Sequence, residues 1–264
     1  MTTATTPPPA TPGRDPGRSP LAGRRVLVSG ASAGIGEATA RALAARGARV
    51  GLLARRADRL DELAGELAGS VAVPVDLTDD DAVVPAVGAT IAALGGLDAV
   101  VHAAGVFHAG EVVPASGGDP VVSPQQWRRM FDLNVVALLV LTRAAAPHLE
   151  VGVDPAVVSI SSMSGRRVPT AAGAVYAASK HAVHAVSEGL RMELAPRGVR
   201  VTTVSPGFVR TGLVDDWPPG PLRDRYSERL AAVGLDPAVV ADAVVHVLVS
   251  PAQVVEYALT SVTQ

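Results

Sequence analysis

Residues 25–46 read RVLVSGASAGIGEATARALAAR, and this stretch decides the fold. An apolar run at 25–29 is followed by a turn that contains Gly30, Gly34 and Gly36, and then by apolar residues at helical spacing. Glycine lets a backbone turn sharply and approach another group closely. The stretch therefore predicts a buried strand, a tight turn and a helix, which together form the first unit of an α/β sheet.

The same alternation continues along the chain. Continuous apolar runs, which are typical of parallel strands buried on both faces, alternate with longer stretches of helical spacing. Strands are predicted at 25–29, 48–54, 71–76, 97–102, 156–161, 200–205 and 255–262, and helices at positions that include 35–46, 79–94, 124–149 and 174–197. The predicted fold class is α/β: a single doubly wound Rossmann-type domain with a seven-stranded parallel sheet flanked by helices.

The domain is expected over residues 21–264, because no repeat or linker interrupts the alternation. Residues 1–20 are rich in Thr, Pro, Gly and Arg and cannot form a core, so they predict a disordered tail; a small docking arm is the alternative. Stretches 111–123 and 212–228 predict loops near the substrate. They follow strand ends on one edge of the sheet, where open α/β sheets bind their ligands.

Composition excludes several classes of protein and of site. The absence of Cys excludes disulfides and thiolate metal sites, and the six His show no metal-ligand spacing. A formal net charge of −2 argues against a broad nucleic-acid surface. The longest strongly apolar run, 135–141, is far shorter than the roughly 20 residues that a bilayer requires, and no apolar signal region is present. We expect a cytoplasmic protein without nucleic-acid or membrane partners.

The glycine turn and the end of the second strand predict a nucleotide site. Free N–H groups at the helix start suit a phosphate, helped by the helix dipole; a glycine-rich turn without a ligand is the alternative. Arg55 and Arg56 stand where an acidic residue would hold the ribose hydroxyls of NAD. Arginine suits the 2′-phosphate of NADP instead, and a solvated helix start is the alternative. Ala33 counts against NADP, because a second basic residue is frequent there.

Tyr176 and Lys180 lie four residues apart and share one face of a predicted helix. An ordinary tyrosine hydroxyl has a pKa near 10, and a nearby ammonium lowers that pKa and eases proton exchange. Such a pair alone occurs by chance on many helices. Here the preceding residues 157–165, VVSISSMSG, read as a strand that runs into a polar turn.

Together these motifs resemble the short-chain dehydrogenase/reductase family. The resemblance covers nearly all of residues 21–264, and its motifs stand in the family's order: the glycine turn, Asp76-Leu77, Ala104-Gly105, Asn134, the Ser–Tyr–Lys group and Pro206-Gly207-Phe208-Val209-Arg210-Thr211. It implies an NADP(H)-dependent oxidoreductase, similar to bacterial carbonyl reductases. Such an enzyme transfers hydride between nicotinamide and a ketone, an aldehyde or a secondary alcohol. Low Lys and high Ala, Arg and Val suggest a GC-rich genome and a role in specialised metabolism.

The resemblance also implies roles for residues. Ser162 would hydrogen-bond the substrate oxygen, and Tyr176 would give or take the proton. Lys180 would bind the nicotinamide ribose and tune Tyr176, while Asn134 would hold a water that links Lys180 to solvent. The residues that would contact the cofactor are Gly30, Ser32, Gly34, Ile35, Gly36, Arg55, Arg56, Asp76, Leu77, Ala104, Gly105, Tyr176, Lys180, Pro206, Gly207, Val209 and Thr211.

Three positions leave alternatives open. Asn134 falls in an apolar stripe at helical spacing, so it is either functional or a buried amide bonded to backbone. The family commonly has Asn-Asn-Ala-Gly where this chain has His102-Ala103-Ala104-Gly105, so an amide that braces the cofactor pocket is absent. Ser162 lies one residue further from Tyr176 than is usual, which leaves Ser164, and less so Ser161, as competing choices.

Two further functions remain possible from the sequence: a cofactor-binding regulator without turnover, and an isomerase or lyase with a retained cofactor. Trp217 either lines the substrate site or packs on its own protein. His184 is expected to be exposed or in an interface, with a part in proton or substrate handling as the alternative. By the resemblance we expect a homotetramer or homodimer, whose helices 124–149 and 174–197 pack across a twofold axis.

Overall fold

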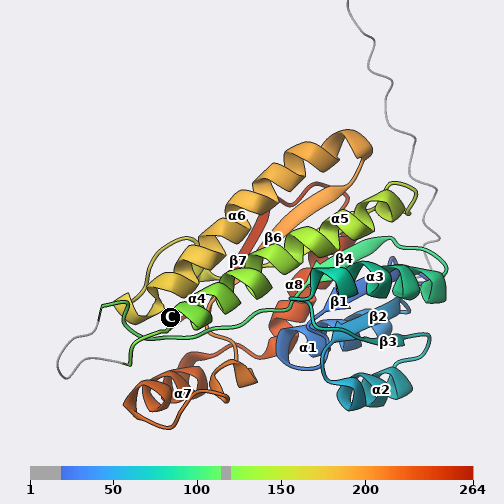
Figure 1. Cartoon of the computed structure of the whole chain (residues 1–264). Helices are drawn as coiled ribbons and strands as arrows, with labels where there is room; N and C mark the ends of the chain where they lie inside the picture. The colour runs from blue at the N-terminus through green and yellow to red at the C-terminus, as the bar shows by residue number, and fades with distance from the viewer. Residues whose placement is uncertain (1–18, 114–119, 264) are drawn as a thin grey trace, which may run out of the picture.

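The computed structural model describes residues 19–113 and 120–263 (Figure 1). Seven strands form one parallel sheet in the order β3-β2-β1-β4-β5-β6-β7, which confirms the predicted fold class. The strands are β1 (Arg25–Ser29), β2 (Arg49–Ala54), β3 (Val71–Pro74), β4 (Ala99–His102), β5 (Ala156–Ile160), β6 (Arg200–Pro206) and β7 (Glu256–Leu259). Residues 1–18 of the expected tail, 114–119 of the first expected loop, and Gln264 lie outside the described residues.

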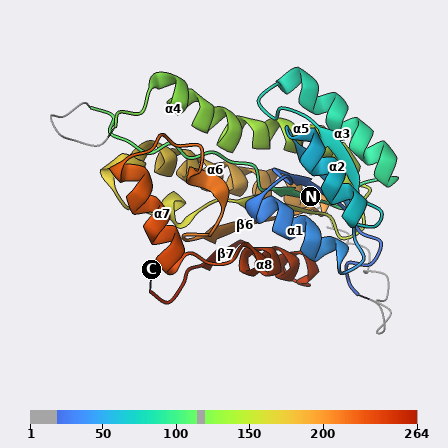
Figure 2. The ribbon, with the colours of Figure 1, turned by 90° about the horizontal axis from the view of Figure 1, so that it is seen from below.

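Helices cover both faces of the sheet (Figure 2). One face carries α1 (Gly34–Ala44), α2 (Ala57–Glu66) and α8 (Pro237–Val249), and the other carries α3 (Asp80–Leu94), α4 (Pro124–Phe131), α5 (Ala137–Leu149) and α6 (Ala174–Leu194). Successive strand residues feed opposite layers: Val26 and Val28 pack toward α1 and α8, and Leu27 packs toward α3 and α5. This is why β1, β2, β4 and β5 are mostly apolar.

The helix predicted at 124–149 contains an irregular turn. A π-helical turn, Asp132–Val136, joins α4 to α5, and Asn134 lies within it. Such an insertion is rare and often marks a functional position. Periodicity alone does not reveal it, because the apolar stripe continues on both sides.

The second predicted loop is partly helical. Only Gly212–Val214, a short 3₁₀ turn, and residues 215–220 precede α7 (Pro221–Val233), so the expectation of a loop through residue 228 is wrong. Gly220 has φ 155°, and Pro221 occupies the first turn, where its fixed φ suits a helix. Leu222, Tyr226 and Leu230 then recur at helical spacing and pack together.

Among the described residues, one helical stretch is long and apolar enough to cross a membrane by length and composition. Sequence patterns did not predict it, because the stretch contains polar residues and its longest continuous apolar run is much shorter. Pro124–Leu149 has a mean hydropathy of 1.4 in its most apolar window. Core helices of globular proteins pass the same test, and this stretch packs against α3 and α6. The test is therefore weak evidence for a membrane span.

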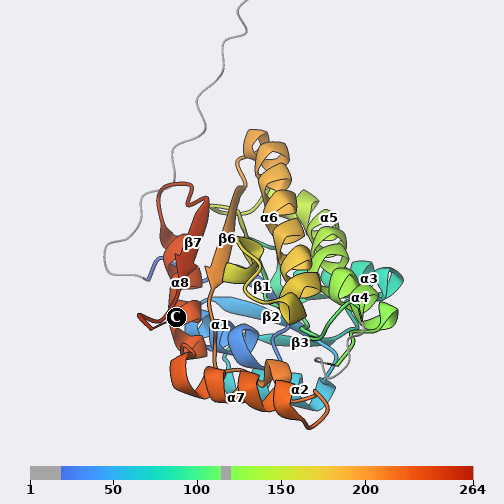
Figure 3. The same cartoon turned by 90° about the vertical axis from the view of Figure 1, so that its left-hand side faces the viewer.

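The strand order reverses between β2-β1 and β4-β5, because β1 has both β2 and β4 as neighbours. In open α/β sheets this switch point opens a crevice at the carboxyl ends of the strands. Figure 3 shows α7 lying across the same end of the molecule as the start of α1. A ligand site is therefore expected in the space between the strand ends and α7.

Candidate active site

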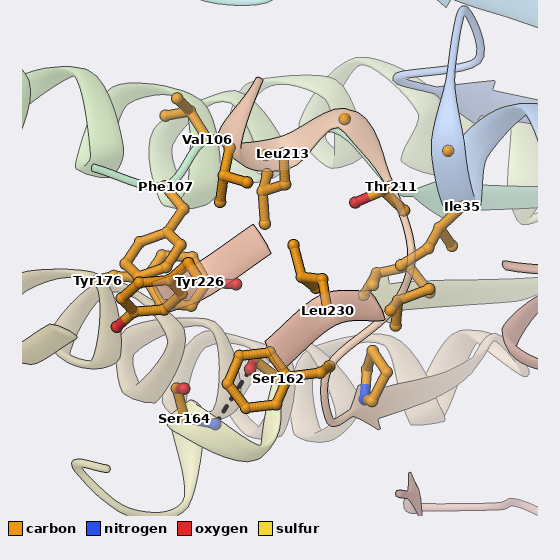
Figure 4. Close-up of a pocket in the computed structure, with 18 of the residues that line it drawn as sticks. Ile35, Val106, Phe107, Ser162, Ser164, Tyr176, Thr211, Leu213, Tyr226 and Leu230 are labelled. Carbon is orange, nitrogen blue, oxygen red and sulfur yellow. Dashed lines mark hydrogen bonds between the residues drawn. The ribbon is translucent and has the colours of Figure 1, made fainter. Parts of the chain in front are cut away.

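A cavity of about 1430 Å³ lies at the carboxyl ends of the central strands, with one wall supplied by α7. All of the residues predicted to contact the cofactor line it except Gly36, and Ser162 lines it as well. In Figure 4, Ile35 and Thr211 stand at one side, and Phe107, Tyr176 and Tyr226 at the other, with Ser162 and Ser164 nearby. One continuous space therefore joins the glycine turn to the Ser–Tyr–Lys group.

The glycine turn fits closely against its surroundings. Gly30 has φ 70°, and a Cβ there would lie 2.7 Å from backbone atoms of Ala104. A Cβ on Gly36 would lie 2.2 Å from the carbonyl oxygen of Gly30, so Gly36 supports the turn from within rather than lining the cavity. No side chain caps the start of α1 at Ala33, which leaves the first N–H groups of the helix for an anion.

Two arginines follow β2 at the cavity wall. Arg56 Nε donates to Ser32 Oγ at 3.2 Å, and Nη2 donates to the Ser32 carbonyl oxygen at 3.0 Å. Arg55 and Arg56 are both exposed and both line the cavity. A fixed guanidinium beside the glycine turn is a suitable partner for a phosphate.

Asp76 lies at the next strand end and accepts hydrogen bonds from Thr78 N and Oγ1 at 3.0 and 2.8 Å. Burial acts to raise the pKa of Asp76, but these hydrogen bonds and the charges of Arg129 and Arg55 hold it below its usual range. The carboxylate is therefore an ionised acceptor at the end of the cavity.

Ser162, Tyr176 and Lys180 meet on one wall. The Ser162 hydroxyl lies close enough to the Tyr176 phenol to act to lower its pKa. Lys180 Nζ donates to the Ile160 carbonyl oxygen at 2.9 Å and lies 5.9 Å from the centre of the Tyr176 ring. Strand β5 and helix α6 thus bring together groups that stand up to eighteen residues apart in the sequence.

The neighbouring serines have other partners. Ser161 Oγ donates to the Lys180 carbonyl oxygen at 3.1 Å, and the Ser164 backbone N–H donates to Ser162 Oγ at 3.0 Å. The geometry therefore favours Ser162 over both alternatives. The extra residue before Tyr176 is accommodated where the chain forms two 3₁₀ turns, Met163–Gly165 and Ala171–Gly173.

Burial dominates the ionisation of this group. It raises the pKa of Tyr176 to about 12, against the lowering effect of the nearby Ser162 hydroxyl, and the nearby phenol of Tyr226 adds to the rise. It lowers the pKa of Lys180 to about 8. The expectation that Lys180 lowers the pKa of Tyr176 is not met in this state, because removal from water outweighs the effect of the amine. Tyr176 is held protonated at neutral pH.

Asn134 is buried and all of its polar groups are engaged. Its Oδ1 accepts from Val106 N at 2.8 Å, and its Nδ2 donates to Val106 O and Ser179 Oγ, both at 3.0 Å. The side chain thus fastens the loop after β4 to α6. It lies behind Gly105, where a Cβ would approach both Asn134 Oδ1 and Lys180 Nζ, and it does not line the cavity.

Comparison with known proteins identifies the family. The family model described as short chain dehydrogenase matches residues 24–221. An uncharacterized oxidoreductase of Staphylococcus aureus is 34% identical over 236 residues, which are 89% of this chain and 94% of that protein. The chain belongs to the short-chain dehydrogenase family. It is therefore an oxidoreductase of a family that uses nicotinamide cofactors.

Solved structures of other short-chain dehydrogenases share the fold. A short chain dehydrogenase from Burkholderia cenocepacia, in complex with NADP, has a TM-score of 0.77 and 33% identity, with 91% of this chain and 97% of that chain covered. An alcohol dehydrogenase from the archaeon Thermococcus sibiricus, complexed with 5-hydroxy-NADP, has a TM-score of 0.79 and 27% identity over the same shares of the two chains.

His102 occupies the place where short-chain dehydrogenases commonly have asparagine. Its Nε2 lies 2.8 Å from Thr142 Oγ1 on α5, and burial lowers the pKa of the imidazole to about 3, so the ring is neutral. The cavity lining along this segment begins at Ala103. His102 therefore joins β4 to α5 and does not replace the missing amide in the pocket.

The sequence predicted that residues 212–228 lie near the substrate, but not that a helix, α7, forms a wall of the cavity there. Tyr226 and Leu230 line the cavity, and only their helical spacing could have indicated this. Trp217 is buried behind Phe107 and Tyr226. It therefore packs on its own protein, which is the second of the two alternatives given for it above. His184 is half-buried rather than exposed, with Nε2 3.3 Å from Ser205 Oγ beneath the turn that carries Ser162.

Proposed function

We propose that this short-chain dehydrogenase is an NADP(H)-dependent carbonyl reductase or alcohol dehydrogenase, which acts on a ketone, an aldehyde or the corresponding alcohol. One observation carries the proposal. The Ser162 hydroxyl lies close enough to the Tyr176 phenol to act on its pKa, and both side chains line a cavity that continues without a break to the glycine turn. A single ligand oxygen between these hydroxyls would receive two hydrogen bonds beside the place where a nicotinamide ring would bind.

The cavity suits a nicotinamide dinucleotide. Gly30 and Gly36 allow the backbone to turn tightly, Gly34 leaves open a space that a Cβ would fill, and the uncapped start of α1 offers N–H groups to the pyrophosphate. At the opposite wall Thr211 comes so close that a Cβ on Gly34 would lie 3.0 Å from its Cγ2. When bound, the reduced cofactor supplies the hydride that adds to the carbonyl carbon.

Ser162, Tyr176 and Lys180 stabilise the developing charge and transfer the proton. Ser162 donates a hydrogen bond to the carbonyl oxygen and so stabilises the negative charge that develops there. Tyr176 holds a proton on its Oη and releases it to the same oxygen, which completes an alcohol. The high pKa of Tyr176 suits this direction, because the phenol is protonated before the reaction starts. Lys180, in its charged form, stabilises the phenolate that remains. Oxidation of an alcohol reverses each step.

The preference for NADP rests on the end of β2. Ala54 is followed by Arg55 and Arg56, so no carboxylate is present there to bond the ribose hydroxyls of NAD. The hydrogen bonds from Arg56 to Ser32 hold a guanidinium beside the turn, where a 2′-phosphate would accept from it. The Burkholderia and Thermococcus relatives, which were solved with NADP and 5-hydroxy-NADP, support the same preference.

The test is a turnover assay with a Tyr176→Phe control. We expect wild-type protein to oxidise NADPH in the presence of one or more aldehydes or ketones, followed by nicotinamide absorbance. Tyr176→Phe should reduce the rate about 10²–10⁴-fold, because the proton donor is lost while the ring remains. NADPH binding, measured by its fluorescence, should persist. A Tyr176→Phe protein as active as wild type, or tight NADPH binding without any turnover, would overturn the proposal.

We also propose that the enzyme is a homotetramer or homodimer. Large apolar side chains are exposed along α4, the π turn and α5, namely Phe131, Val136 and Leu139, with Met192 on α6. Such a surface is suited to self-association about a twofold axis. Light scattering on the purified protein is the check, and a monomer at micromolar concentration would refute it.

A further inference from the structure

Aromatic residues are concentrated at one place in this molecule. The whole chain has three Phe, two Trp and three Tyr. Five of these eight, listed here, form one connected set of ring contacts: Phe107, Tyr176, Phe208, Trp217 and Tyr226. The rest of the core consists mainly of Ala, Val and Leu. A fold that needs so few rings elsewhere does not need five here for packing, so the set is better suited to contact with a ligand.

The rings form a supported wall. The centre of the Phe107 ring lies 4.4 Å from that of Tyr176 and 5.0 Å from that of Trp217. Trp217 Nε1 donates to the Phe107 carbonyl oxygen at 2.7 Å, which fixes Phe107 from behind. Tyr226 on α7 meets Phe107 edge-on at 5.4 Å (Figure 4). Phe107 and Tyr226 thus present ring surface to the cavity next to Tyr176.

The hydroxyl of Tyr226 has no hydrogen bond to any residue of the described chain, although it is half-buried among rings in a cavity wall. It lies near Gly173, where a Cβ would come within 3.8 Å of the oxygen, and close enough to Tyr176 to oppose its ionisation. A phenol in such surroundings usually finds a partner. A ligand atom beside the reacting carbonyl can provide one.

Charge around the α7 side of the cavity is balanced. Three cations and three anions line it: Arg167, Arg225, Arg229, Asp215, Asp216 and Glu228. Arg229 is also held over the Phe208 ring, with 5.2 Å between the guanidinium carbon and the ring centre. A mixed rim of this kind does not select a strongly anionic ligand or carrier. It favours a neutral molecule.

We propose that the substrate is an uncharged carbonyl compound with a flat ring, which lies against Phe107 and Tyr226, and with a second oxygen that hydrogen-bonds the Tyr226 hydroxyl. Tyr226 is then a specificity-determining residue. The inference rests on the proposed function for the reaction itself, but it concerns only the wall that holds the substrate.

The flat ring is tested with two ketones of the same carbon skeleton. We expect kcat/KM for acetophenone to exceed that for cyclohexyl methyl ketone by roughly threefold to tenfold, because a planar ring stacks on the aromatic wall and a puckered ring does not. Equal values, or a preference for the cyclohexyl ketone, would overturn the proposal.

The second oxygen is tested with hydroxyacetophenones and Tyr226→Phe, which keeps the ring contacts. Wild type should prefer the best hydroxyacetophenone isomer over acetophenone, and Tyr226→Phe should reduce that ratio about tenfold. Tyr257→Phe is the matched control, since this tyrosine lies on β7 against His246 and does not line the cavity. An unchanged ratio in Tyr226→Phe would refute the assigned role.

A binding assay separates this inference from the proposed function. In a Trp127→Phe background the only remaining tryptophan is Trp217, which contacts Phe107 and Tyr226, so its fluorescence reports ligands at the wall without turnover. Preferential quenching by acetophenone without any reduction would overturn the proposed function and support the wall. Equally tight binding of cyclohexyl methyl ketone would overturn the wall whatever the turnover.

Discussion

Lys180 is the only lysine in the chain, and it is buried beside Tyr176. Apart from the histidines, all other basic side chains are arginines, which keep their proton in proteins. The Lys180 amine differs, because burial lowers its pKa to about 8, where it can gain or lose a proton near neutral pH. The chain therefore carries a side-chain amine at a single position, and that position is in the cavity.

The pKa of Lys180 can be measured directly. Labelling with lysine enriched in ¹⁵N at Nζ should give one resonance, which titrates near pH 8 in the ligand-free protein. The rate of reduction should fall as the pH rises through the same region, because the neutral amine no longer stabilises the phenolate. A resonance that titrates only near its ordinary pKa of 10.5 would contradict the role assigned to burial.

The same residue makes stability depend on pH. Its folded-state pKa lies below the unfolded value of 10.5, so the unfolded chain binds more protons between pH 8 and pH 10. Its contribution to the free energy of unfolding should thus rise with pH there, by about 2–3 kcal/mol. Urea unfolding at both pH values checks this, and Lys180→Met is the control that should lack the rise. Tyr176 opposes this rise only near pH 10, because the pKa of its unfolded form is 10.0 and burial raises the folded value.

Arg56 is predicted to set the cofactor preference. Arg56→Ala removes the guanidinium beside Ser32 and should lower kcat/KM for NADPH about 10–100-fold with much less effect on NADH, as expected for loss of a charged hydrogen bond. Arg59→Ala, one turn along α2 and paired with Glu62, is the matched control. Equal losses with both cofactors would point to a folding defect.

At the scale of elements, Asp98 holds together the amino ends of β1 and β4. Its carboxylate accepts from Arg25 N at 2.8 Å, from Arg25 Nη2 at 2.6 Å and from Val153 N at 2.8 Å, while only 2% of the residue is exposed. Burial acts to raise the pKa of Asp98, but these hydrogen bonds outweigh it and keep the pKa below its usual range. The strand ends are fixed at the edge opposite the cavity.

Asp98→Ala should therefore destabilise the protein by about 3–5 kcal/mol, because it leaves two backbone N–H groups unpaired and removes the carboxylate partner of a partly buried arginine. Asp242→Ala, which removes an exposed partner of Arg46, should cost less than about 1 kcal/mol. Chemical denaturation of both variants gives the comparison. Since the folded pKa is depressed, the wild-type contribution from Asp98 should be present above the unfolded pKa and be lost as the pH falls through the folded one.

At the scale of the whole molecule, the cavity takes residues at or just beyond the carboxyl ends of all seven strands, and from α7. A ligand in it binds the folded chain only, so NADP⁺ at a hundred times its Kd should add about 2.7 kcal/mol to the free energy of unfolding. For a chain of this size that corresponds to a rise in Tm of about 5–10 °C. NAD⁺ at the same concentration should raise Tm less, and equal shifts in a thermal melt would argue against the NADP preference.

Much of this architecture follows from local patterns. The apolar runs locate β1, β2 and β5 within one or two residues, because a strand buried on both faces is apolar over most of its length. The sequence predicts β7 too long and predicts a loop where α7 begins, because both boundaries depend on what packs against these segments. The π turn around Asn134 also escaped prediction, because one added residue does not disturb an apolar stripe on its two sides.

The sequence by itself determined the order of elements, the glycine turn and the Tyr176–Lys180 pair, all of which depend on residues close together in the chain. Only the tertiary structure decided which serine meets Tyr176, that Tyr176 is held protonated, and that rings from four separate segments form one wall with it. The physical reason is that burial and contact between distant segments are set by packing, and neither is encoded in spacing along the chain.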